Sequence, residues 1–197
     1  MLFNINESIL ISILIIFIYI FYSLNKNNLT LVSIKTGEHF MVYNDMNKET
    51  AANILSDVTK RMYKLRNYLE QNITKYDEHK EYIKLLVDNM NTKRTSIYEN
   101  DPNSNLTSFS VNKGEEIAFC LKSKKNGNFH EINLLMYVAI HEMAHVACPE
   151  VGHGDLFKKI FQFLVLRAID INIYNKEDYG SKPVEYCGMM LSSSIVQ

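Results

Sequence analysis

The spacing of hydrophobic positions along this chain predicts separate groups of helices and strands. Between residues 47 and 72, apolar residues recur every three or four positions opposite a charged face, which is typical of an amphipathic helix. Residues 77–91 repeat this pattern, with Asp77 as the expected N-cap. Residues 29–45 and 107–121 each combine short alternating or apolar runs with a glycine turn, which predicts two pairs of short strands.

The second half of the chain predicts two further helices. Residues 130–146 are mostly apolar, which indicates a buried helix, and Pro149 ends it because proline disfavours helix in the residue before it. Asp155 is the expected N-cap of a last helix over residues 156–174, and the tail after it predicts no regular element. Because strands and helices are grouped and do not strictly alternate, the expected fold class is α+β.

The N-terminus differs from the rest of the chain. Residues 9–24 contain no charge, and as one helix they would extend about 24 Å, just short of a hydrocarbon core of about 30 Å. Bulky Phe21 and Tyr22 stand where a signal peptide needs small residues for cleavage. We therefore expect a transmembrane helix that anchors the chain in a membrane.

This expectation divides the chain into an anchor with its linker at residues 1–27 and a folded domain at residues 28–197. Lys26 and Lys35 follow the apolar segment, and no basic residue precedes it. The positive-inside rule then predicts a single-pass membrane protein whose folded domain lies in the cytosol.

Charge and cysteine content narrow the function classes. The net charge is −1 over 197 residues, so no basic surface indicates a nucleic-acid partner. The three cysteines are widely spaced and form no CxxC pair, which argues against a disulfide framework. We expect free thiols in a reducing compartment.

Three of the six histidines lie within thirteen residues, in the segment HEMAHVACPEVGH. His141 and His145 are four positions apart, so on a helix they share one face and can bind one metal ion. Zinc accepts imidazole nitrogen at about 2.0–2.1 Å and lowers the pKa of a bound water to about 7. Glu142 lies about 100° around the helix from His141, where it can take a proton from that water without binding the metal.

A third ligand is expected from the loop that follows. Seven residues separate His145 from His153, enough for the loop to turn back and complete the site. Alternatives are a surface role for His153, with Glu150 or Asp155 as the ligand in its place. Cys148 is expected to be a small buried residue. The alternative for the whole cluster is a set of hydrogen-bonded core histidines.

The segment 141–157 resembles the H-E-x-x-H…G-H-x-x-x-F pattern of the WLM and SprT-like zinc peptidases, which are related to proteases that clear DNA–protein crosslinks. The strand pair at 107–121 and the segment KPVEYCGM at 182–189 are similar to a branch found in large DNA viruses and single-celled eukaryotes. The resemblance spans residues 51–189. It implies a compact zincin-like core, in which a short, mostly antiparallel sheet packs on the active-site helix and an edge strand binds an extended peptide.

The resemblance also implies zinc as cofactor, with His141, His145 and His153 as ligands and Glu142 as general base. The expected function is that of a membrane-anchored zinc metalloendopeptidase, whose peptide substrate adds as a strand to residues 107–112 or 117–121. Tyr186 is either a catalytic residue that helps to hold the oxyanion or a packed aromatic. The alternatives are a non-catalytic, zinc-stabilised membrane protein that acts as a binding module, and a DNA–protein crosslink protease.

Overall fold

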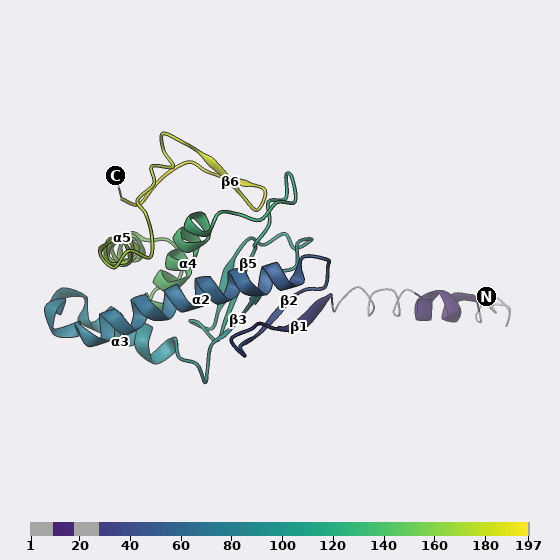
Figure 1. Cartoon of the computed structure of the whole chain (residues 1–197), viewed down its shortest axis with the longest axis horizontal. Coiled ribbons are helices and arrows are strands. Elements are labelled where there is room, and N and C mark those ends of the chain that lie inside the picture. The colour runs from purple at the N-terminus through teal and green to yellow at the C-terminus, as the bar shows by residue number, and fades with distance from the viewer. Residues whose placement is uncertain (1–9, 18–27, 197) are drawn as a thin grey trace, which may run out of the picture.

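A five-stranded sheet forms one layer of the fold, in a computed structural model that describes residues 10–17 and 28–196. The strand order is β1-β2-β3-β5-β4. Helix α2 crosses one face of this sheet, as Figure 1 shows. The strands are β1 (Leu29–Ser33), β2 (His39–Tyr43), β3 (Ser96–Glu99), β4 (Phe109–Val111) and β5 (Glu116–Phe119).

The sheet is mixed, which corrects the expectation of a mostly antiparallel one. β1 and β4 pair antiparallel with β2 and β5, but β3 pairs parallel with both β2 and β5. For β2 and β3 the reason lies in the connection, because the chain forms two α-helices between them and a long helical crossover joins parallel strands. The four-residue β3 has no clear alternation of apolar and polar residues, so no local pattern predicted it.

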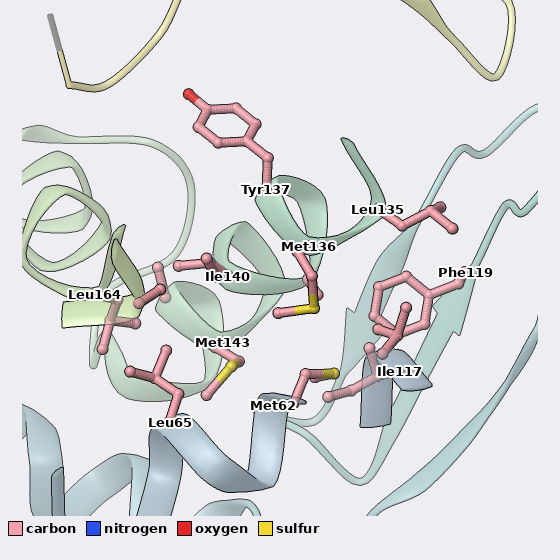
Figure 2. Close-up of a cluster of buried hydrophobic side chains, with 14 of the residues drawn as sticks. Met62, Leu65, Ile117, Phe119, Leu135, Met136, Tyr137, Ile140, Met143 and Leu164 are labelled. Carbon is pink, nitrogen blue, oxygen red and sulfur yellow. The ribbon is translucent and has the colours of Figure 1, made fainter. Parts of the chain in front are cut away.

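The α+β class is confirmed, and all four helices expected after residue 45 are present. α4 is central, since eleven of its 16 residues are buried. Figure 2 shows its residues Met136 and Met143 beside Met62 and Leu65 of α2. Each such side chain contributes about 1.5–3 kcal/mol when fully buried, so this contact fixes α4 against the rest of the fold. The helices are α2 (Lys48–Gln71), α3 (Lys80–Asn89), α4 (Ile132–Ala147) and α5 (Asp155–Asp170).

Neither Asp77 nor Asp155 is the N-cap that the sequence predicted. Asp77 begins a short 3₁₀ helix (Asp77–His79), and the cap of α3 is His79. Asp155 is the first residue of α5, after Gly154 at the cap. Its carboxylate still lies in the first turn, where the helix dipole favours negative charge.

A hairpin of β6 (Val184–Tyr186) and β7 (Met189–Leu191) stands in the tail, where no regular element was expected. Cys187 and Gly188 form its tight turn, both with positive φ. A disulfide joins Cys187 to Cys120 at the end of β5, with the two Cα atoms 6.2 Å apart. The expectation of free thiols is therefore wrong for this pair, which tertiary folding brings together across 67 positions. Cys148 is free and buried, as expected.

The predicted transmembrane helix at residues 9–24 is also wrong. Of this segment the structure describes residues 10–17, which are helical, and the remainder lies outside the described residues. Among the described residues, no helix is both long and apolar enough to cross a membrane. The expected membrane anchor, and the single-pass localisation with a cytosolic domain, are therefore not supported.

Candidate metal centre

The three clustered histidines meet at one point. His141 and His145 lie on the last two turns of α4, and His153 comes from the exposed loop between α4 and α5. The Nε2 atom of His145 is 3.2 Å from that of His141 and 3.1 Å from that of His153, and the third pair is 3.1 Å apart. Phe157 packs against all three rings from the first turn of α5, with its centroid 4.3 Å from that of His145.

Hydrogen bonding among the rings cannot account for this arrangement. A neutral imidazole nitrogen is either a donor or an acceptor. Three mutually close nitrogens therefore always include one pair of the same kind, which repels. A cation that takes a lone pair from each nitrogen satisfies all three. Tetrahedral zinc with bonds of about 2.0–2.1 Å needs nitrogens roughly 3.3 Å apart, and the observed spacings match this requirement.

The surroundings keep two of these rings neutral and able to bind a metal. Burial, together with the smaller effects of the neighbouring His145 and His153, lowers the pKa of His141 to about 3. Burial likewise lowers the pKa of His145 to about 4, assisted by His153 and the ammonium group of Lys113. Near neutral pH both rings therefore carry a free lone pair, as a metal ligand must.

Glu142 lies beside the cluster but outside it. Its side chain is 4% exposed and lines the same cavity as the three histidines. Burial raises the pKa of the Glu142 carboxyl, and although the nearby Ser110 hydroxyl of β4 partly opposes this rise, the pKa still reaches about 7. A carboxyl group with a pKa near the working pH can both accept and return a proton.

Tyr186 lines the cavity from the hairpin. Its hydroxyl donates to the carbonyl of Cys120 at 3.1 Å and is hydrogen-bonded to the Ser108 side chain. Burial raises the pKa of the Tyr186 phenol, and the nearby Glu142 carboxylate raises it further. The phenol therefore stays protonated, but in this arrangement its proton points at a backbone carbonyl.

The alternative ligands named from the sequence do not join the cluster. Within the part of the chain that the structure describes, the ligand atoms that converge belong to the three histidines alone. The Asp155 carboxylate is fully exposed and pairs with Lys158 at 3.4 Å. Glu150 lines the cavity but is not one of the converging groups.

The cavity has a volume of about 680 Å³ and contains side chains for which the sequence predicted no individual role. Ser108 and Ser110 enter from β4 or its start, and Lys113 enters from the turn after it. Nothing in the local sequence distinguishes these residues, because only the packing of β4 beside α4 brings them to the histidines. Met189 and Leu191 of β7 also line this cavity.

Comparison with known proteins gives relatives from three viruses. No protein-family model matches the chain. It is 44% identical over 193 residues to the uncharacterized protein R325 of Acanthamoeba polyphaga mimivirus, covering 98% of this chain and 97% of that protein. It is 41% identical over 71 residues to protein 136R of Invertebrate iridescent virus 6, covering 35% of this chain and 39% of that protein. With protein 042R of Invertebrate iridescent virus 3, identity is 37% over 82 residues, covering 42% of this chain and 50% of that protein.

Among solved structures, a crystal structure of a Wss1 mutant from Saccharomyces cerevisiae is similar, with a TM-score of 0.50 and 18% identity. The similarity covers 66% of this chain and 88% of that chain. It supports the WLM-like fold expected from the sequence, and at this identity it concerns the fold alone.

Proposed function

The chain belongs to the same family as protein R325 of Acanthamoeba polyphaga mimivirus, and we propose that it is a zinc-dependent metallopeptidase. One observation carries the proposal: three imidazole nitrogens converge within 3.2 Å of one another at a cavity, with the buried Glu142 carboxyl beside them. A purely structural zinc site is usually closed by four protein ligands and needs no base next to it.

His141, His145 and His153 would hold the metal. Zinc, when bound, supplies a Lewis acid and lowers the pKa of a coordinated water to about 7. Glu142 would act as general base, taking the proton from the attacking water and passing it to the leaving amine. Its burial keeps bulk water away from the carboxyl.

Of the two strands predicted to receive substrate, β4 is the better candidate. β5 is paired on both sides, with β3 and β4, whereas β4 is the last strand of the sheet. Residues 107–110 also line the cavity. An extended peptide could therefore pair with the outer edge of β4 by backbone hydrogen bonds and pass the metal centre. Tyr137, Val138, Met189 and Leu191 give the cavity an apolar wall that would receive an apolar side chain of the substrate.

Metal removal tests this function directly. We expect the full chain to bind about one zinc ion and to cleave members of a broad peptide library. A chelator should abolish cleavage, and added zinc should restore it, because the ion supplies the Lewis acid. Zinc content by mass spectrometry and cleavage by peptide sequencing are the measurements. Zinc binding without cleavage of any peptide would favour the binding-module alternative, and cleavage only with added DNA would favour the crosslink-protease alternative.

Tyr186 remains a candidate for holding the oxyanion, provided that its hydroxyl exchanges the Cys120 carbonyl for the substrate. On this proposal, Tyr186→Phe lowers kcat by about 100-fold with little change in KM, because one donor to the transition state is lost. Ser108→Ala is the matched control, since it removes the neighbouring hydroxyl and keeps the phenol proton. A Tyr186→Phe enzyme with normal kcat and a lower melting temperature would show that Tyr186 is a packed aromatic.

A further inference from the structure

Lys113 reaches the end of the active-site helix from the sheet. Its Nζ atom is 2.5 Å from the carbonyl oxygen of Cys148, 2.7 Å from that of Glu150 and 3.4 Å from that of His145. α4 ends at Ala147, and the last carbonyls of a helix have no partner within the helix. A lysine ammonium there satisfies these carbonyls and complements the negative end of the helix dipole.

The turn that carries Lys113 is built to approach α4 closely. Lys113 and Gly114 both have positive φ, and a Cβ at Gly114 would lie 2.9 Å from a methyl group of Val146. Glycine suits that position because its φ of 98° disfavours other residues and because a larger residue would have to displace the Val146 side chain. Arg94 supports the turn from behind, donating to the carbonyls of Asn112 at 2.6 Å and Lys113 at 3.0 Å. These hydrogen bonds and the close packing hold the backbone of Lys113 in place.

The loop that Lys113 holds is the one that delivers the third histidine. Residues 149–154 are all exposed, and the side chain of Val151 is 93% exposed. Such a segment buries little apolar surface that could fix its path. The bonds from Lys113 to Cys148 and Glu150 restrain its first half, and His153 follows three residues after Glu150.

We propose that Lys113 is a positioning residue, which holds the α4–α5 loop so that His153 reaches the metal bound by His141 and His145. This inference rests on the proposed zinc site. A metal ligand must be held within roughly 0.5 Å of its productive position, and groups that orient ligands are worth about 10- to 100-fold in metal affinity. Because Lys113 directly follows the β4 region, the same residue also ties the strand proposed to bind substrate to the loop of the third ligand.

A role in binding a substrate carboxylate fits less well, although Lys113 lines the cavity. A lysine ammonium has three hydrogens to donate. Three backbone carbonyl oxygens already surround it, so no donor remains for a ligand.

The test measures metal binding by the full chain, apart from activity. We expect Lys113→Met to weaken zinc affinity by about 10- to 100-fold in competition with a chromophoric chelator, and to alter the visible spectrum of the cobalt-loaded protein. Lys113→Arg, which keeps the charge and the donors, should recover most of the affinity. Lys64→Met is the matched control, because Lys64 donates to the carbonyl of Ile171 at the end of α5, at 3.3 Å. It should leave zinc affinity within about twofold of wild type, as for a neutral surface change.

The possible results distinguish a failure of the Lys113 positioning role from a failure of the proposed zinc site. Lys113→Met that binds zinc as tightly as wild type, with an unchanged cobalt spectrum, would overturn the positioning role and leave the zinc site intact. An equal loss of zinc affinity in Lys64→Met would also overturn the positioning role, because it would show that any such change destabilises the protein. Wild type that binds zinc no better than His141→Ala would instead refute the metal centre itself. If Lys113→Met does not fold, Lys113→Gln takes its place under the same criteria, since its neutral, shorter side chain also loses the ammonium.

Discussion

Glu142→Gln is expected to abolish peptide cleavage while leaving zinc bound. The amide has nearly the same shape as the carboxyl but cannot take a proton, so kcat should fall by about 10²- to 10⁴-fold, the usual contribution of a general base. Zinc affinity should change little, because Glu142 is not among the converging ligand atoms. The fold should also tolerate the change, since a hydrogen-bonded amide is less costly to bury than a carboxylate. The measurements are kcat on a cleaved library peptide, zinc content and melting temperature.

The control for this variant is Glu150→Gln. Glu150 lines the same cavity, but it is exposed, and its backbone carbonyl, not its side chain, accepts the bond from Lys113. Its replacement should leave kcat nearly unchanged. A Glu142→Gln enzyme that kept more than about a tenth of wild-type kcat would rule out Glu142 as the general base, because that loss is smaller than a general base provides.

His153→Ala is expected to remove the metal and, with it, all activity. The loss of one of three ligands should weaken zinc binding by more than about 100-fold, beyond the range for a group that only orients a ligand. His153 is the most informative of the three histidines to replace, because it lies on an exposed loop. Its removal leaves no cavity in the core, unlike a change within the buried helix α4. Chelator competition on the metal-free protein gives the affinity.

Two control variants make the result specific. His39→Ala removes an exposed histidine on β2 that is no part of the cluster, and it should leave zinc affinity unchanged. Asp155→Ala removes the alternative ligand that the sequence allowed, and it should also have no effect. If Asp155→Ala lost the metal and His153→Ala kept it, the third ligand would be Asp155, and the assignment of His153 would be wrong.

The sequence was sufficient where the signal is local. Helix periodicity placed α2, α3, α4 and α5 within a few residues of their observed bounds, because the face that a helix buries repeats every 3.6 residues whatever it packs against. The spacing of His141 and His145 predicted that they share one face for the same reason. The local pattern was misleading at the N-terminus, where an uncharged run predicted a membrane helix that the described residues do not contain.

The tertiary structure decided everything that depends on distant partners. β3 became a strand because β2 and β5 flank it, and the disulfide formed because folding brought Cys187 beside Cys120 across 67 positions. Lys113 contacts the end of α4 because its turn packs against that helix, and no sequence motif in the turn indicates this contact. Thus the sequence by itself determined the helices and which residues could bind a metal, since those follow from neighbours along the chain. Only the fold decided the sheet order, the cavity walls and the supports of the third histidine, because these contacts join residues whose proximity no local pattern encodes.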